Sequence, residues 1–363
     1  MTTEEYWFWL CGAEGIYRDT ISRLLSVYET PEAIYRLGYK KLSESDVISK
    51  KLAWNLFSQN ESGDFLRRLE KIKASKTDFV YYESEDFPEK LKTIPSPPYC
   101  LYVKGRLPNP NLAACAIVGA RACSEYGKKE AVRFSSALAE RGVQIISGMA
   151  SGIDSIAQKA AIDADGSTFA VLGGGVDVIY PASNRQLYYD IIAAGGGIIS
   201  EYPPQTAPAP WQFPFRNRII SGLADKLLII EARKRSGTLS TARHALDQGR
   251  DIYALPGRVT DPLSEGCNDL IFDGAGILTD PGYIINDFFF KDAPSKRLLS
   301  GENKDREDID ETGILKYLSY HAQGADEIAK KAQMSIEDVT VKLAVLELEG
   351  RAKEVGKDFY VKI

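Results

Sequence analysis

The sequence predicts an α/β fold built on a parallel sheet with helices on both faces. Between Ala114 and Leu255, apolar runs of three to five residues alternate with amphipathic helical stretches, as in successive βα units. Glycines gather directly after these runs, at positions 119, 148, 173–175 and 257. Open α/β sheets bind ligands beyond the carboxyl ends of their strands, so this Rossmann-like region also predicts where a binding site lies.

Two smaller regions precede and lead into this sheet. Residues 1–75 predict a small helical module, of the SAM-like or helix-hairpin-helix-like type, because apolar residues recur at helical spacing in 21–28 and 33–37. Thr30 followed by Pro31 has the signature of a helix start. Residues 76–110 are strand-like and rich in proline, and we expect short strands that extend the α/β domain over 76–290.

The C-terminal part predicts a winged-helix domain at 310–363, after a charged and aperiodic linker at 291–309. Helices are expected at 314–318, 326–331 and 339–346, and two strands at 352–355 and 359–361. A helix that reads DNA should be basic. The third helix instead carries four acids and one lysine, which favours packing or protein contact: Glu337, Asp338, Glu347 and Glu349 against Lys342.

Composition excludes several classes of protein. The chain has 363 residues, 44% hydrophobic and 26% charged, which fits a globular protein of two or three domains. Five scattered cysteines, two histidines and no CxxC pair argue against a disulfide framework and against a zinc site, and we expect no metal and no cofactor. The acidic N-terminus and the short apolar runs predict neither a signal peptide nor a membrane span, so we expect a cytoplasmic protein with reduced thiols.

The segment 213–258 is basic although the chain carries a net charge of −5: it holds nine Lys or Arg against four Asp or Glu. Such a concentration predicts a directed anion site. Its sharpest group is Arg216, Asn217 and Arg218, because two guanidinium groups beside an amide can hold a phosphate and a base or ribose edge. The alternative is that these arginines pair with Asp225 or Glu231 on the protein's own surface.

Several glycine-containing turns are candidates to bring backbone N–H groups to the same anion. They are Gly119 with Arg121, then Gly148, Ser151 and Gly152, then Gly173 and Gly175 with Asn184 and Arg185, and finally Lys234 and Arg235 with Ser236, Gly237 and Thr238. Simpler roles as helix caps remain open for Asp154, Asn184, Ser236 and Thr238. The G-x-G-x-x-G fingerprint is missing after the first strand, which argues against NAD or FAD.

The ordered motifs of the core resemble the DprA (Smf) family of DNA-processing proteins. They are 116–121 with Tyr126-Gly127, then 147–154, 171–184, Ser200-Glu201-x-Pro203, 213–222, Glu231-Ala232, 236–242 and Gly266-x-Asn268. The resemblance implies a non-enzymatic, homodimeric protein of natural transformation that protects single-stranded DNA and loads the recombinase RecA onto it. It also places Arg121, Arg216, Asn217 and Arg218 in the family's DNA pocket.

The chain departs from the family pattern at three positions near that pocket. Ser151 stands where an arginine is common, Gln158 where a histidine is common, and Phe215 where a second basic residue often precedes R-N-R. These changes predict weaker binding, or a footprint shifted toward 233–235. Phosphates are expected on Arg121, Arg216 and Arg218, with Phe215 or Phe213 as a stacking face for a base.

Two other functions remain open. Rossmann-like folds with such turns also resemble nucleoside-monophosphate phosphoribohydrolases, and a nucleotide-processing enzyme of that kind would need Glu201, Glu231 or Asp177 as its catalytic carboxylate. No G-x-S-x-G, P-loop or H-E-x-x-H motif demands catalysis, and His244 is expected to be a packed or surface residue. The third possibility is a scaffold that binds only proteins, which the basic segment disfavours.

Overall fold

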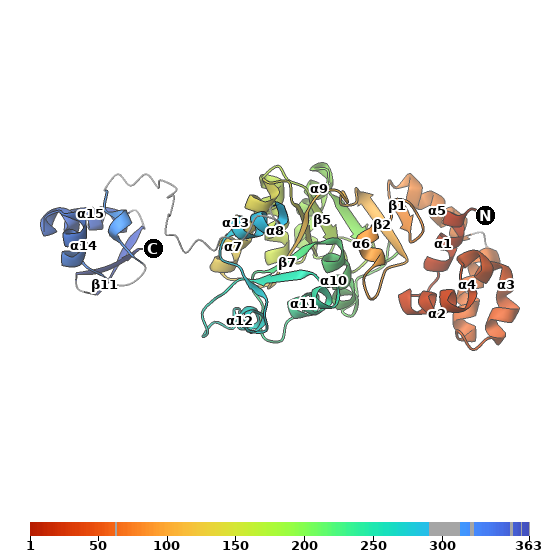
Figure 1. The fold of residues 1–363 in the computed structure, drawn as a ribbon. Coiled ribbons are helices and arrows are strands. Elements are labelled where there is room, and N and C mark those ends of the chain that lie inside the picture. The colour runs from red at the N-terminus through yellow and green to blue at the C-terminus, as the bar shows by residue number, and fades with distance from the viewer. Residues whose placement is uncertain (62–63, 290–312, 320–322, 349–350, 357, 363) are drawn as a thin grey trace. The chain divides into compact units, whose positions relative to one another are not determined.

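The computed structural model describes residues 1–363 except 62–63, 290–312, 320–322, 349–350, 357 and 363 (Figure 1). The chain forms two compact units, Met1–Ala293 and Pro294–Ile363. The predicted linker at 291–309 lies outside the described residues. No helix of the described part is both long enough and apolar enough to cross a bilayer.

A nine-stranded sheet organises the first unit, within the described residues, in the order β1-β2-β6-β5-β4-β3-β7-β8-β9. The strands are β1 (Asp78–Tyr81), β2 (Cys100–Gly105), β3 (Ala114–Val118), β4 (Gln144–Ser147), β5 (Thr168–Val171), β6 (Gly197–Ser200), β7 (Lys226–Ile229), β8 (Asp251–Ala254) and β9 (Gly276–Ile277). Every residue of β3 to β7 is buried, because helices cover both faces. The predicted parallel sheet is confirmed for β3 to β9.

The strands predicted to lead into the domain are part of the same sheet. β2 pairs antiparallel with β6, Val103 opposite Ile199, and β1 pairs antiparallel with β2. The sheet is therefore mixed, which the proline-rich sequence of 76–110 did not indicate.

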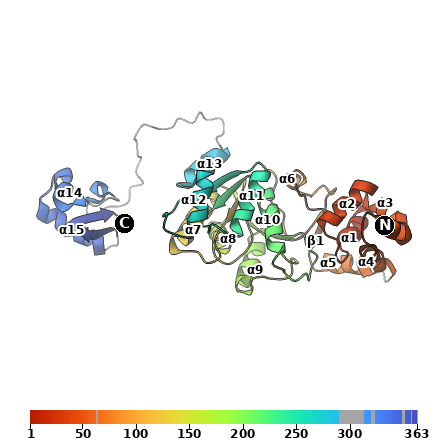
Figure 2. The ribbon, with the colours of Figure 1, turned by 90° about the horizontal axis from the view of Figure 1, so that it is seen from below.

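Helices cover the two faces of the sheet in the order that alternating βα units require (Figures 1 and 2). One face packs against α7 (Glu125–Ala139), α8 (Ile153–Asp163), α9 (Arg185–Ala193) and α13 (Pro281–Phe289). The other packs against α6 (Glu89–Lys92), α10 (Gln212–Leu223), α11 (Thr238–Asp247) and α12 (Glu265–Phe272). A short 3₁₀ turn, η1 (Ala182–Asn184), precedes α9.

The N-terminal helical region shares its apolar core with one end of the sheet. Its helices are α1 (Thr3–Cys11), α2 (Arg18–Tyr28), α3 (Pro31–Glu44), α4 (Lys50–Glu61) and α5 (Asp64–Ala74). The hydroxyl of Thr30 accepts the N–H of Ala33, which confirms the predicted start of α3. Trp7 and Phe8 of α1 contact strand β1. The rings of Phe8 and Phe79 meet edge to face with centroids 5.1 Å apart.

The second unit is a winged-helix domain. It contains η2 (Leu315–Tyr317), α14 (Ala325–Ala332), α15 (Ile336–Leu348) and a sheet in the order β10-β12-β11, formed by β10 (Gln323–Gly324), β11 (Ala352–Gly356) and β12 (Phe359–Lys362). Ile328, Leu343 and Leu346 lie at the centre of its core. The expected first helix at 314–318 is only a 3₁₀ turn, and β10 was not predicted.

Candidate functional site

A cavity of about 560 Å³ lies at the carboxyl ends of the central strands. The turns that follow β3, β4 and β7 meet α10 there, and a pouch of about 60 Å³ adjoins it. The predicted residues that line one or both spaces are Arg121, Gly148, Ser151, Arg216, Asn217, Ser236, Gly237 and Thr238. The fold thus brings together side chains that are up to 117 positions apart in sequence (238 − 121).

Arg121 is the accessible cation of this cavity. It follows β3, is exposed, and makes no ion pair among those formed by the described residues. Its guanidinium carbon lies 5.5 Å from the centre of the Phe213 ring, and that ring lies 5.5 Å from the ring of Tyr180. An anion with an attached planar group would meet both charge and aromatic surface at this point.

Arg216 is fixed beneath the cavity rather than extended into solvent. It is only 5% exposed, and its Nη1 donates to the carbonyl oxygens of Gly148 (2.9 Å) and Val171. Gly148 permits this approach, because a Cβ there would lie 2.7 Å from Nη2 of Arg216. Burial lowers the pKa of Arg216 to about 10, with Asp154 opposing that shift, so the side chain is still charged at neutral pH.

Asp154 joins the turns that follow β3 and β4. Its carboxylate accepts the N–H of Gly148 at 3.1 Å. Burial raises its pKa, while Arg216 and backbone N–H groups, including that of Gly119, oppose the rise. The cap interpretation is wrong, because Gly152 is the N-cap of α8. Gly152 has a φ of 83°, and a Cβ there would lie 2.3 Å from the carbonyl oxygen of Ala120, so this glycine is required for the close contact of the two turns.

Asn217 holds the turn at the start of α11. Its Nδ2 donates to the hydroxyl of Ser240 (2.9 Å) and to the carbonyl oxygen of Gly237 (3.3 Å). The N-cap is Gly237, without a side-chain cap, and the hydroxyl of Thr238 donates instead to the carbonyl oxygen of Gly119 (3.2 Å). The shielded hydroxyl of Ser236 has no partner within the described chain. The cap interpretation of Ser236 and Thr238 is therefore wrong, and the positive end of α11 faces the cavity.

Arg218 does not reach the cavity, contrary to our expectation. It is 2% exposed, its Nη2 lies 2.7 Å from both carboxylate oxygens of Glu201, and its guanidinium carbon lies 4.0 Å from the centre of the Phe215 ring. The reason is geometric. α10 turns about 100° per residue, so positions 216 and 218 point in nearly opposite directions, whereas 215 and 218 share a face. Phe215 is therefore also unavailable as a stacking face at this cavity.

The alternative pairing of these arginines is not observed either. Asp225 pairs with Lys90 at 2.6 Å, and Glu231 accepts the backbone N–H of Ser124 at 3.0 Å. Glu201, which was considered only as a catalytic carboxylate, is the true partner of Arg218. No sequence pattern indicates this pair, because it depends on where β6 lies beside α10.

The remaining predicted residues lie behind or beside the cavity. Gly173 and Gly175 are buried, and Gly173 lies directly beneath the ring of Phe213. Asn184 occupies the N-cap position of α9, as predicted, but its side chain makes no capping hydrogen bond and donates instead to the carbonyl oxygen of Met149 at 2.9 Å, which connects two loops. Arg185, Lys234 and Arg235 are exposed but do not line the cavity. Sequence reasoning missed Tyr180, Pro210 and Pro214, although Tyr180 and Pro214 belong to the ordered motifs of the core.

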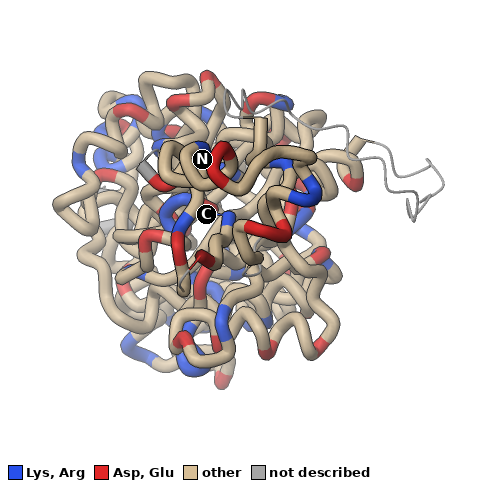
Figure 3. Tube along the Cα trace, turned by 90° about the vertical axis from the view of Figure 1, so that its left-hand side faces the viewer, with Lys and Arg blue, Asp and Glu red and all other residues tan. Residues whose placement is uncertain are grey.

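Positive charge is therefore more local than segment 213–258 suggested. Arg216 and Arg218 are buried, and Lys226 is buried between Asp251 and Asp287 at the other end of β7. Along the trace, basic and acidic residues are interspersed (Figure 3). What remains at the cavity is Arg121, the fixed charge of Arg216 and the N-terminus of α11, with the exposed 233–235 beside them.

Comparisons with known proteins identify the family of this chain. The family model for DNA recombination-mediator protein A matches residues 78–289, and the model for the DprA winged helix domain matches residues 300–356. Protein Smf of Escherichia coli is 38% identical over 273 residues, which cover 74% of this chain and 73% of that protein. DNA processing protein DprA of Streptococcus pneumoniae is 41% identical over 204 residues, which cover 56% of this chain and 72% of that protein.

Two solved structures are similar at 30% sequence identity. The X-ray structure of DNA processing protein A from Streptococcus pneumoniae has a TM-score of 0.67 and covers 79% of this chain and 98% of that one. The structure of DNA processing protein A from Helicobacter pylori, described for its mode of binding single-stranded DNA, has a TM-score of 0.52 and covers 59% of this chain and 95% of that one.

Proposed function

Since the chain belongs to the family of DNA recombination-mediator protein A, we propose that it binds single-stranded DNA at the cavity beside Arg121. Arg121 takes a phosphate by charge-assisted hydrogen bonds, while Arg216 and the N-terminus of α11 add fixed positive potential. Asn217 acts as a positioning residue that holds the α11 turn.

The observation that carries this proposal is the contact between Arg121 and the Phe213–Tyr180 ring pair. A phosphate at Arg121 brings its own base within reach of an aromatic face. Stacking on such a face contributes about 1–3 kcal/mol per base and needs an unpaired base. Single strands are therefore favoured over duplex.

Salt-dependent binding of a fluorescent oligothymidine tests the proposal. We expect binding to weaken with salt, and Arg121→Ala to reduce the slope of log K against log salt by about 0.7, the value for one phosphate contact on a single strand. Arg141→Ala is the matched control, because Arg141 is also exposed but directly precedes β4, at the amino ends of the parallel strands and away from the cavity. If Arg121→Ala and Arg141→Ala give the same slope, Arg121 is not in the site.

The cellular role follows the family. We propose a cytoplasmic homodimer that protects incoming strands during natural transformation and loads RecA onto them.

A sheet edge at β9 supports self-association, because exposed apolar side chains surround it, among them Leu246, Ile277 and Phe272, which is 92% exposed. Light scattering of the wild type and of Phe272→Glu tests the dimer. The ATPase activity of RecA on strands coated with single-strand-binding protein tests the loading. We expect the onset of ATP hydrolysis to be accelerated when this protein is added, and not in its absence.

We propose no enzymatic activity on nucleotides. The three carboxylates considered for it have structural partners: Glu201 pairs with Arg218, Glu231 accepts from Ser124, and Asp177 accepts the N–H of Gln205 at 2.6 Å. None of them lines the cavity beside Arg121. Incubation with AMP should release no adenine, and release of adenine at a rate proportional to protein concentration would contradict this view.

A further inference from the structure

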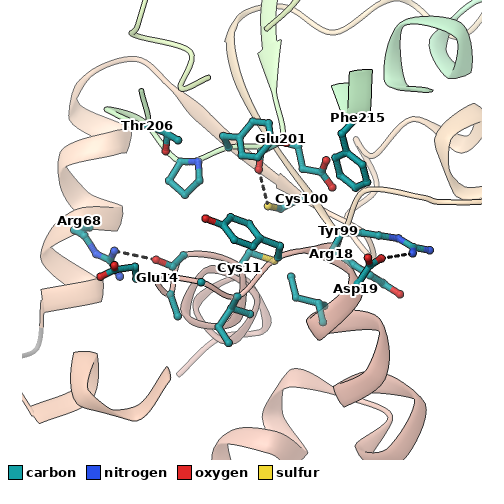
Figure 4. A pocket seen from close by; sticks show the side chains of 18 of the residues that line it. Cys11, Glu14, Arg18, Asp19, Arg68, Tyr99, Cys100, Glu201, Thr206 and Phe215 are labelled. Atoms are coloured by element: carbon teal, nitrogen blue, oxygen red, sulfur yellow. Dashed lines mark hydrogen bonds and ion pairs between the residues drawn. The ribbon is translucent and has the colours of Figure 1, made fainter. Parts of the chain in front are cut away.

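A second cavity of about 560 Å³ lies between the N-terminal helices and the sheet, on the other side of α10 from the first one (Figure 4). Cys11, Arg18 and Arg68 of the helical region face Glu201, Thr206 and Phe215 of the sheet region across it. Its size and its mainly apolar lining with a few polar groups are those of small-ligand sites in proteins. Nothing in the proposed function uses it.

Aromatic rings form one wall of this cavity. Trp211 meets Tyr17 edge to face at 5.5 Å and meets Tyr202 edge to face at 6.0 Å. Trp211 and Tyr17 are each 51% exposed, so both keep a free surface. Tyr99 and Phe215 belong to the same lining. Flat, partly open aromatic surfaces of this kind bind planar ligands by stacking.

The lining residues also carry polar atoms that the protein itself does not satisfy. Among the described residues, the hydroxyl of Tyr202 and the Nε atoms of Arg18 and Arg68 are shielded from solvent without a hydrogen-bond partner. Tyr202 is only 4% exposed. Buried polar atoms normally have partners, and these three belong to residues that line one cavity, so they are the groups that a ligand there would be expected to engage. The two Nε atoms can only donate a hydrogen bond, and the tyrosine hydroxyl can donate or accept one. This set suits a ligand edge that is rich in acceptor atoms.

We propose that this cavity binds a nucleobase. A base combines the flat ring that the aromatic wall selects with the acceptor atoms that the orphaned groups require. An inorganic anion would leave the wall unfilled, and an apolar ring would leave the donors unpaired. The base belongs either to a free nucleotide or to a bound DNA strand. Only the second source rests on the proposed function.

Titration calorimetry with AMP and dTMP tests the free-nucleotide source, with ribose 5-phosphate as the ligand that lacks a base. We expect the two nucleotides to bind and ribose 5-phosphate not to bind. Trp211→Ala should weaken the nucleotides about tenfold or more through lost stacking, and Tyr202→Phe about fivefold through one lost hydrogen bond. Trp54→Ala is the matched control, since Trp54 is also 51% exposed but does not line the cavity.

Oligothymidine and an abasic oligodeoxyribose phosphate of equal length test the strand source. If the base comes from DNA, Trp211→Ala weakens only the oligothymidine. Arg121→Ala should weaken both oligomers but should not change the loss of mononucleotide binding that Trp211→Ala causes, so a failure of the proposed function is distinguishable from a failure here. The proposal is overturned if Trp211→Ala and Trp54→Ala behave alike with every ligand. It is equally overturned if N-acetyl-tryptophanamide, which has no base edge, binds as tightly as AMP.

Discussion

Arg218→Ala should destabilise the protein without removing a DNA contact, although Arg218 belongs to the most basic motif of the chain. The substitution removes an ion pair in which Nη2 of Arg218 lies 2.7 Å from each carboxylate oxygen of Glu201, and leaves Glu201, whose side chain is 11% exposed, without its partner. Breaking a buried pair on one side costs about 3–5 kcal/mol. The lost contact with the Phe215 ring at 4.0 Å adds about 0.5–2 kcal/mol. Arg121→Ala, at an exposed position, should change the free energy of unfolding by less than about 0.5 kcal/mol.

Urea unfolding followed by tryptophan fluorescence measures this effect, because Trp7, Trp9, Trp54 and Trp211 all lie in the unit Met1–Ala293. A double variant, Arg218→Met with Glu201→Leu, should recover part of the loss, since removing both charges leaves neither unpaired. The salt slope of oligothymidine binding should stay at the wild-type value in Arg218→Ala. An unchanged urea midpoint together with a slope reduced by about 0.7 would refute the assignment of Arg218 to the interior.

Three further predictions concern the cavity beside Arg121. Gly148→Ala places a Cβ 2.7 Å from Nη2 of Arg216, so it should cost about 1–3 kcal/mol in urea unfolding and weaken oligothymidine binding. Asn217→Ala should weaken binding severalfold, because the α11 turn loosens, yet leave the salt slope unchanged, because no charge is lost. Lowering the pH should tighten oligothymidine binding, since the raised pKa of Asp154 lets this carboxyl take up a proton at a higher pH than an ordinary aspartate and lose its negative charge, and Asp154→Asn should abolish that dependence in anisotropy titrations. The stability that Asp154 contributes through its raised pKa is present below its ordinary pKa and is lost as the pH rises through the folded-state value, so wild type should lose stability relative to Asp154→Asn over that range.

The sequence predicts the layered fold well, because buried parallel strands and amphipathic helices leave a strong periodic signal. The antiparallel β1 and β2 were harder, since proline-rich strands at 76–110 do not reveal which edge they join. At the cavity, glycine turns and Arg121 were predictable because the strand ends of a parallel sheet must converge. The position of Arg218 was not predictable in this way, because the motif Arg216-Asn217-Arg218 suggests one shared anion site, whereas α10 turns its successive side chains away from one another.

The apolar contacts between α1 and the sheet edge matter for anyone who trims this protein. A recombinant fragment starting at residue 78, where the family match begins, would retain every strand of the large sheet. It would nevertheless uncover the rings of Phe79 and Tyr102, which Phe8 now shields. Such a fragment is expected to aggregate in solution. A lower DNA affinity of the fragment would therefore reflect aggregation rather than the loss of a nucleic-acid contact made by the removed helices.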